Sequence, residues 1–265
     1  MINVSIVLYT HTLSEISPLI NTLRKSSVIS DIILIDNSPE INREFETLEV
    51  IYLFNGKNIG YGAAHNIAIQ KTIDKNIPYH LVLNPDISFK PEILNIIALF
   101  MNNNSKIGQL MPKVYYPNGD IQYLCKLLPT PFNLIFRRFL PATWTQKLTE
   151  KFELRKSGYS QLLDVPYLSG CFMFLRTEAL EEVGLFDERF FMYPEDIDLT
   201  RRIHSKYRTV FYPDVSIVHH HAKDSYESLK MLKIHIVNII KYFNKWGWIF
   251  DKERRVINKE TIDQL

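Results

Sequence analysis

The chain has 265 residues, of which 46% are hydrophobic and 23% charged, and its formal net charge is +2. This composition is typical of a soluble globular protein, excludes disorder over most of the chain, and gives no overall electrostatic attraction to nucleic acid. No apolar run approaches the roughly 20 residues that span a bilayer. Cys125 and Cys171 are the only cysteines, and no secretory signal precedes the first predicted strand. We therefore expect free thiols and a cytoplasmic location.

Strand and helix patterns alternate through the N-terminal half. Continuous apolar runs predict buried strands, and apolar residues at helical spacing predict the helices between them. The predicted strands cover residues 3–10, 31–38, 49–55 and 80–86, and the predicted helices cover 13–26, about 63–74, and 91–103. This repetition predicts an α/β fold with a doubly wound, parallel sheet.

Polar residues follow several of the predicted strands: Thr10 and His11, then Asp36 and Asn37, then Asp86. Ligands of doubly wound sheets bind beyond the carboxyl ends of the strands, so this clustering points to a binding site. Each residue taken singly also fits ordinary turn chemistry.

The second half is less regular. Residues 126–141 hold three prolines and predict an irregular excursion, and residues 165–184 predict a strand that runs into a short helix ended by Gly184. Residues 209–221 predict a pair of strands ending in three histidines. Residues 226–247 predict an amphipathic helix whose default role is packing.

The segment "NIGYGAAHN" (58–66) invites comparison with the dinucleotide fingerprint G-x-G-x-x-G. It differs because His65 stands in place of the third glycine, and because the segment follows the third predicted strand and not the first. Gly60 and Gly62 are equally suited to a tight turn. The start of a helix here could still receive a phosphate group.

Two further segments offer metal ligands. "LNPDI" (83–87) places a carboxylate at the end of a buried strand, and "VHHHAKDS" (218–225) places histidines at the end of another. Oxygen and nitrogen ligands of this kind suit a divalent cation, and two protein ligands leave positions that a diphosphate would fill. A turn and a surface loop are the structural alternatives.

The stretch "FFMYPEDIDLTRR" (190–202) concentrates Glu195, Asp196 and Asp198 after an apolar run. Pro194 suits the first position of a helix, and acids in the first turn favour the positive end of the helix dipole. Arginines three and four residues after Asp198 can pair with it across one turn. These rules explain Asp198 well and Asp196 only in part.

In order, the segments "SIVLYT", "IDNS", "NIGYGAAHN", "LNPDI", "LSGCFMFLRTEAL", "FDERFFMYPEDIDLTRR" and "VHHHAKDS" resemble the inverting family 2 glycosyltransferases with the GT-A fold. They are most similar to the rhamnosyltransferase-like branch, which builds bacterial surface polysaccharides. The resemblance covers about residues 3–225. It implies transfer of a sugar from a nucleoside diphosphate to an acceptor hydroxyl, with inversion at the anomeric carbon.

The resemblance also implies roles for individual residues on the donor side. Thr10 and Asp36 fall where the family holds the nucleoside, with Asp36 at the pyrimidine ring. Asp86 matches the last aspartate of the family's D-x-D element, in which Asn84 replaces the first. His219 matches the later metal-side histidine, with His220 as a near alternative. The remaining matches to the loop and helix beside the donor are Asn58, Gly60 and Asn66.

On the acceptor side, Asp196 matches the catalytic base of the family's Glu-Asp motif. A carboxylate there would take the proton of the attacking hydroxyl opposite the departing diphosphate. Glu195 and Gly170 match the acceptor side of the pocket, and Asp198 and Arg201 are expected to hold the frame.

These implications define the expected organisation. A GT-A domain with a mostly parallel central sheet flanked by helices is expected over residues 1–225. It has a donor-binding half of about 1–120 and an irregular acceptor-side half of about 121–225, and a helical extension follows over 226–265. The expected cofactor is Mg²⁺ or Mn²⁺. The expected donor is a dTDP- or UDP-linked sugar, namely dTDP-rhamnose or a UDP-hexose. The expected acceptor is a glycan or a lipid-linked glycan. A non-catalytic nucleotide-sugar binding protein and a dinucleotide-dependent oxidoreductase are the rival interpretations.

Residues 126–141 and the C-terminal helix ending "KYFNKWGW" combine basic and aromatic residues, a composition of interfacial segments. This composition motivates the hypothesis of peripheral contact with the cytoplasmic face of a membrane, although packing on the core is the ordinary role of such residues. In the alternative, Phe132, Ile135, Phe136 and Phe139 cap the core while Arg137 and Arg138 are solvated.

Overall fold

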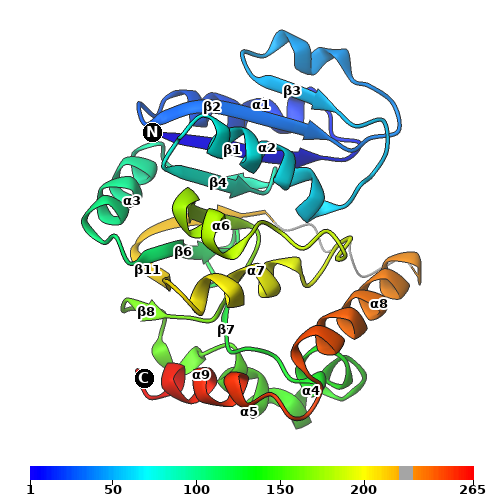
Figure 1. The fold of residues 1–265 in the computed structure, drawn as a ribbon, viewed down its shortest axis with the longest axis vertical. Helices are drawn as coiled ribbons and strands as arrows, with labels where there is room; N and C mark the ends of the chain where they lie inside the picture. Colours follow the sequence, from blue (N-terminus) through cyan, green and yellow to red (C-terminus); the bar gives the residue numbers. More distant parts are fainter. Residues whose placement is uncertain (221–228) are drawn as a thin grey trace.

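A computed structural model describes residues 1–220 and 229–265 (Figure 1). The N-terminal half alternates strands and helices, as the sequence predicts. Its elements are β1 (Ile2–Leu8), α1 (Leu13–Arg24), β2 (Ile29–Asp36), the 3₁₀ turn η1 (Arg43–Thr47), β3 (Ile51–Phe54), α2 (Tyr61–Asp74), β4 (Tyr79–Leu83), β5 (Ile87–Ser88), α3 (Glu92–Asn103) and β6 (Ile107–Tyr115).

The second half begins with short elements and ends with longer helices. These elements are β7 (Cys125–Lys126), α4 (Pro131–Leu134), η2 (Phe136–Phe139), α5 (Ala142–Phe152), η3 (Arg155–Ser157), β8 (Leu163–Asp164), β9 (Tyr167–Leu168), β10 (Phe172–Arg176), α6 (Thr177–Val183), α7 (Glu195–His204), β11 (Arg208–His219), α8 (Leu229–Trp246) and α9 (Lys252–Ile262). The longest elements that were not predicted from the sequence are β6 and α5, whereas α9 falls within the expected helical extension.

The described residues form a nine-stranded sheet in the order β3-β2-β1-β4-β10-β6-β11-β5, with β8 paired to β11. The strands β3, β2, β1 and β4 are parallel, and β6 and β11 are parallel to each other. The expectation of a mostly parallel sheet is confirmed: β10 enters between β4 and β6 and pairs with both in the antiparallel direction, and β5 and β8 are antiparallel to β11. The sheet is therefore mixed, with most of its strands running the same way.

Residues 208–219 correct one expectation, because they form the single strand β11 and not two strands. The register of β11 against β6 shifts between Tyr212 and Ser216. Pro213 lies within that interval and cannot donate a ladder hydrogen bond, which accounts for an irregularity inside one strand. His221, the last of the predicted run, lies outside the described residues.

Helices cover both faces of the sheet, which explains why β1 is buried along almost its whole length. One face packs the apolar sides of α1 and α3. The other face packs α2, α6 and α7 against alternate residues of the same strands, including Val82, Met173 and Leu175. The carboxyl ends of β1 and β4 and the start of α7 lie at the same edge of the molecule (Figure 1).

A chain of buried polar side chains crosses the second of these faces. Ser5 Oγ lies 2.6 Å from His65 Nδ1 and 2.7 Å from His80 Nε2, and His80 Nδ1 lies 2.7 Å from Thr72 Oγ1. All four side chains are fully buried. Burial lowers the pKa of His80 to about 3, and burial together with the neighbouring His80 lowers the pKa of His65 well below its ordinary value. Both rings are therefore neutral in the folded protein at physiological pH.

The neutral state of His80 predicts a loss of stability in acid. In the unfolded chain His80 has a pKa near 6.5 and in the folded chain about 3, so between these values the unfolded state binds more protons and the free energy of unfolding falls as pH falls. Below pH 6, we expect the free energy of unfolding of His80→Gln to change less steeply with pH than that of the wild type. The difference in slope should be up to about 1.4 kcal/mol per pH unit. Urea unfolding at a series of pH values measures it.

The exposed His220 supplies the matched control, because His220→Gln should leave that slope unchanged. Comparison with the wild type at each pH cancels the opposing contribution of groups whose pKa is raised on folding. Equal slopes for wild type and His80→Gln would contradict a neutral buried His80.

Candidate active site

A cavity of about 920 Å³ opens at the carboxyl ends of β1 and β4, where ligands bind in sheets of this kind. Its walls come from β1 and α1, the loops after β2, β3 and β4, the start of α7, and the end of β11. The lining residues that the sequence singled out are Asn37, Asn58, Asn84, Asp86, Gly170, Glu195, Asp196, His219 and His220, together with His11. The structure thus gathers segments more than 200 residues apart in the chain around one space.

Asp196 lies in the first turn of α7 and is held by two main-chain donors. Its Oδ2 accepts a hydrogen bond from the Gly170 N–H at 3.0 Å, and its Oδ1 accepts one from the Ile197 N–H at 2.8 Å. A side chain at position 170 would begin 3.2 Å from the Asp196 Cβ, so glycine permits the close approach of the two segments. The carboxylate is therefore fixed in orientation while it faces the cavity.

Glu195, beside it, is only 5% exposed. Burial, with a further contribution from the charge of Asp196, raises the pKa of Glu195 to about 8. Burial also raises the pKa of Asp196, but the N–H groups of Gly170 and Ile197 stabilise its charged form. The pair therefore divides its charge at neutral pH: Glu195 holds a proton and Asp196 is the carboxylate that stays ionised.

Asp86 and His219 form a second polar pair in the cavity, with Asp86 Oδ1 3.3 Å from His219 Nε2. Gln122 sets the tautomer of His219, because the Gln122 amide donates to the main-chain oxygen of His219 at 2.8 Å and so turns its own oxygen toward His219 Nδ1, 2.9 Å away. Nδ1 then carries a proton, and Nε2 faces the carboxylate.

This arrangement fits a divalent cation. An imidazole nitrogen and a carboxylate oxygen are directed at one another, and a buried amide orients the ring, as outer hydrogen bonds do for metal-ligating histidines. Within residues 1–220 and 229–265, no group of three or more His, Cys, Asp or Glu side chains is placed to hold a metal. A cation here would therefore need further ligands from its substrate or from water. His220 points elsewhere, to Ser88 Oγ at 3.0 Å.

Four other predicted residues do not line the cavity. Asp36 is fully buried, accepting from the Ser38 N–H at 2.9 Å and from the Tyr52 hydroxyl at 2.6 Å. Thr10 is exposed, beside the lining residues Tyr9 and His11. Their proposed contacts with a nucleoside stay predictions.

The other two of the four support the cavity wall from behind. Gly60 has a φ of 95°, and any side chain there would collide with the Phe191 carbonyl, which accepts from the Tyr61 N–H at 2.9 Å. Asn66 binds the 186–188 segment: its amide donates to the Phe186 carbonyl at 2.9 Å and to Glu188 Oε1 at 3.0 Å. Both residues thus fix the loop that leads into α7.

Sequence reasoning missed Tyr61 and Tyr193, which also line the cavity. The Tyr61 hydroxyl lies 2.9 Å from both Asn84 Oδ1 and the Gly170 carbonyl, so it joins the loop after β4 to the segment that holds Asp196. A tyrosine inside the "NIGYGAAHN" motif was the available signal, but its partner 109 residues away could not be read from the chain.

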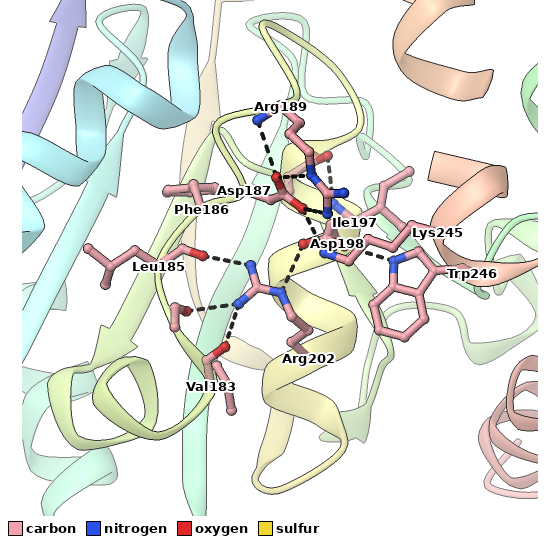
Figure 2. Close-up of polar contacts among 12 residues, drawn as sticks. Val183, Leu185, Phe186, Asp187, Arg189, Ile197, Asp198, Arg202, Lys245 and Trp246 are labelled. Atoms are coloured by element: carbon pink, nitrogen blue, oxygen red, sulfur yellow. Dashed lines mark hydrogen bonds and ion pairs between the residues drawn. The ribbon is translucent and has the colours of Figure 1, made fainter. Parts of the chain in front are cut away.

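A polar network behind the cavity attaches α8 to α7 (Figure 2). Asp198, which is fully buried, accepts from Arg202 Nε at 2.8 Å and Trp246 Nε1 at 2.7 Å, and its Oδ1 lies 2.6 Å from Lys245 Nζ. Lys245 also pairs with Asp187 at 2.8 Å. The predicted pairing of Asp198 with an arginine one turn later is confirmed for Arg202.

Arg201 behaves differently from the expectation that it pairs with Asp198. Its guanidinium forms a bidentate pair with Asp251, at 2.8 and 2.9 Å, and reaches Glu253 at 2.7 Å. Because successive helix positions point about 100° apart, Arg201 and Arg202 serve opposite sides of α7. Arg201 therefore holds the start of α9.

No model of a known protein family matches the chain. The chain is 28% identical over 177 residues to an N-acetylglucosaminyl-diphospho-decaprenol L-rhamnosyltransferase of Mycobacterium tuberculosis, covering 63% of this chain and 57% of the relative. It is 26% identical over 219 residues to the rhamnosyltransferase WbbL of Escherichia coli, covering 80% of this chain and 77% of the relative. The match therefore spans little more than half the length of the first of these relatives.

Among solved structures, the chain is similar to GalNAc-T7 crystallised with UDP, GalNAc and Mn²⁺, with a TM-score of 0.62 and 14% identity over 90% of this chain and 47% of that one. Likeness at this identity shows the fold alone. The GT-A fold and the resemblance to rhamnosyltransferase-like family 2 glycosyltransferases are confirmed.

The network in Figure 2 predicts a large loss of stability for Asp198→Asn. The substitution keeps the shape and removes the charge, which leaves the partly buried Arg202 and Lys245 without their common partner. We expect the free energy of unfolding to fall by about 3 kcal/mol, measured by urea unfolding followed by far-UV circular dichroism. The exposed Asp263→Asn is the control and should change stability by less than about 0.5 kcal/mol; a similar small change for Asp198→Asn would contradict the structural role.

Proposed function

We propose that this protein is an inverting glycosyltransferase, which moves rhamnose or a hexose from a nucleoside-diphosphate sugar to an acceptor hydroxyl in the synthesis of a bacterial surface polysaccharide. The observation that supports it best is the Asp196 carboxylate in the wall of the cavity, oriented by hydrogen bonds from two main-chain N–H groups beside Glu195, whose pKa is raised by burial. A protein that only binds nucleotide sugars has no need of a carboxylate positioned in this way.

The reaction is a direct displacement. The acceptor hydroxyl loses its proton to Asp196 as its oxygen bonds to the anomeric carbon, and the diphosphate departs from the opposite face, which inverts that carbon. The buried surroundings raise the pKa of Asp196 and so make it a stronger base. The neutral Glu195 leaves one negative charge, and not two, next to the acceptor.

On the donor side, Asp86 and His219 would hold Mg²⁺ or Mn²⁺, and a bound cation would balance the charge of the leaving diphosphate. The solved relative GalNAc-T7 contains Mn²⁺ and UDP, which supports this choice by fold analogy. Asn58 lines the same cavity, and Gly60 and Asn66 shape the loop beside it. We assign the nucleoside to Thr10 and Asp36, at the edge of that space.

The donor is proposed to be dTDP-rhamnose or a UDP-hexose. The name of the mycobacterial relative states L-rhamnosyl transfer to a sugar that is carried on a lipid diphosphate, which supports rhamnose and a lipid-linked glycan acceptor for this chain. Transfer would take place on the cytoplasmic side of the membrane. Within the described residues, no helix is long and apolar enough to cross a bilayer.

Asp196→Asn tests the proposal directly. The variant keeps the size and polarity of the side chain but removes the proton acceptor, so we expect the rate of sugar transfer to fall about 100- to 10,000-fold while the affinity for the donor changes little. Release of nucleoside diphosphate in the presence of acceptor measures the rate, and calorimetry measures donor binding.

Glu195→Gln is the matched control for the same pair of residues. Glutamine resembles the protonated glutamic acid, so this variant should keep its activity at neutral pH. Wild-type turnover by Asp196→Asn, or an equal loss in the two variants, would contradict Asp196 as the base.

The metal assignment predicts that Asp86→Ala and His219→Ala each weaken the binding of a nucleoside diphosphate in the presence of Mn²⁺ by about tenfold or more. Binding of the nucleoside alone should be unaffected, because only the diphosphate reaches the cation. Calorimetry with and without EDTA makes the comparison, and His220→Ala, which alters the neighbouring residue, is the control. If the loss appeared in His220→Ala and not in His219→Ala, the assignment would be wrong.

A further inference from the structure

Helix α8 carries apolar side chains on both of its faces. The inner face packs into the domain through Ile239, Tyr242 and Phe243, which are at most 2% exposed. On the outer face, Ile236, Val237 and Ile240 are 39%, 42% and 40% exposed. A helix that packs on a single core needs only one apolar stripe, so the outer stripe has no use in folding.

The outer stripe continues into the loop after α8, where Trp248, Ile249 and Phe250 are 37%, 66% and 88% exposed. The Trp248 indole donates to Asn244 Oδ1 at 2.8 Å, which places it one turn beyond Ile240 on the same side. We call Lys233, Ile236, Val237, Ile240, Trp248, Ile249 and Phe250 the α8 face. Six large apolar or aromatic residues exposed together are more than the scattered ones of an ordinary surface.

The loop is held in place with these side chains outward. The buried guanidinium of Arg254 donates to the carbonyls of Gly247, Trp248 and Ile249 at 3.4, 3.2 and 3.5 Å. The exposure of Ile249 and Phe250 is thus a property of an ordered loop.

The charge of this segment identifies the surface that it fits. Residues 229–250 contain no aspartate or glutamate, and of their lysines whose side chains the structure describes only Lys245 is paired with carboxylates, those of Asp198 and Asp187. Lys233 is exposed beside the apolar stripe. Apolar and aromatic side chains flanked by basic ones suit the headgroup region of an anionic bilayer, where each lysine adds attraction and the charges prevent the helix from crossing.

The inner side of helix α8 contacts the loop that lines the cavity. Asn238, on α8, donates to the Met192 carbonyl at 2.8 Å, and the His235 and Tyr193 rings lie 5.1 Å apart. Met192 and Tyr193 both line the cavity. Only the width of helix α8, which lies at the right of the molecule in Figure 1, therefore separates its outer side from the loop that lines the cavity beside Asp196.

We propose that the α8 face docks on the surface of an anionic lipid bilayer and so brings the cavity to an acceptor anchored in that bilayer. The docking is inferred from the α8 face alone. Its purpose, which is delivery of the acceptor, rests on the proposed function. This places the main membrane contact on α8 and the following loop. Of the apolar residues singled out in 126–141, Phe136 is 57% exposed, Phe132 and Ile135 are half-buried, and the side chain of Phe139 lies outside the described residues.

Sedimentation of the full chain with lipid vesicles tests the docking. We expect the wild type to bind vesicles of phosphatidylcholine with phosphatidylglycerol more strongly than vesicles of phosphatidylcholine alone. The double variant Ile249→Ser/Phe250→Ser should lose about tenfold or more of this binding, because two large apolar side chains no longer enter the bilayer. Lys233→Gln should lose about fivefold, and only on the anionic vesicles.

Helix α3 offers the control, because it exposes Ile96 and Leu99, at 44% and 63%, on the far left of Figure 1. Ile96→Ser/Leu99→Ser should bind vesicles as the wild type does, and both double variants should keep the wild-type melting temperature. The proposal is overturned if the wild type does not sediment with anionic vesicles, or if the two double variants bind equally. It is also overturned if light scattering shows a dimer that Ile249→Ser/Phe250→Ser dissociates, because a second copy would then cover the face.

Enzyme assays separate this proposal from the proposed function. Ile249→Ser/Phe250→Ser should transfer sugar to a water-soluble acceptor at the wild-type rate and lose activity only on an acceptor embedded in vesicles. Asp196→Asn should bind vesicles normally and be inactive on both acceptors. If the wild type bound vesicles but were inactive on every acceptor, the proposed docking would stand and the proposed function would be wrong. If the wild type and Ile249→Ser/Phe250→Ser were equally active on the embedded acceptor, the docking would have no role in delivering the acceptor.

Discussion

The buried carboxylate of Asp198 is the interaction on which the geometry of the site depends. An ionised group without water is stable only when charged or polar donors surround it, and Asp198 has Arg202 from its own helix and Lys245 and Trp246 from α8 (Figure 2). Arg202 in turn donates to the carbonyls of residues 183, 184 and 185 at the end of α6. The start of α7, and with it the cavity-facing Asp196, is therefore fixed by one buried charge that three helices share.

Two opposing effects act on the acids at the start of α7, and their magnitudes decide the outcome. A helix N-terminus stabilises a nearby carboxylate by about 0.3–1 kcal/mol, which lowers a pKa by less than one unit. Burial raises the pKa of Glu195 from 4.5 to about 8, which is several times larger. Loss of water therefore determines the pKa of Glu195, whereas Asp196 keeps its charge because two main-chain N–H groups donate hydrogen bonds to its carboxylate. The helix dipole alone could not have distinguished the two adjacent residues.

The parts of the structure that could be predicted from the sequence are those that local rules determine. Continuous apolar runs predicted β1, β2 and β4, and a four-residue spacing predicted the contact of Asp198 with Arg202. The insertion of β10 between β4 and β6 and the pairing of Arg201 with Asp251 depend on contacts between distant segments, which no local spacing encodes. Helix α5 goes against the usual pattern, because it exposes Trp144 and buries Thr145. Strand-end positions suggested that a histidine of 218–221 could share a cation with Asp86, but only the family resemblance singled out His219, because the antiparallel pairing of β5 with β11 that brings the two together is a contact between distant segments.

The lysines of α8 show how one helix can serve both the site and a surface. Lys245 turns inward and pairs with Asp198 and Asp187, whereas Lys233 lies on the outer face among apolar side chains. Because the inward contacts are buried and charged, α8 and α7 form one unit and do not slide freely against each other. A surface that binds α8 would therefore also set the orientation of Asp196 relative to that surface. The same contacts that hold the base in place would determine from which side a membrane-bound acceptor reaches it.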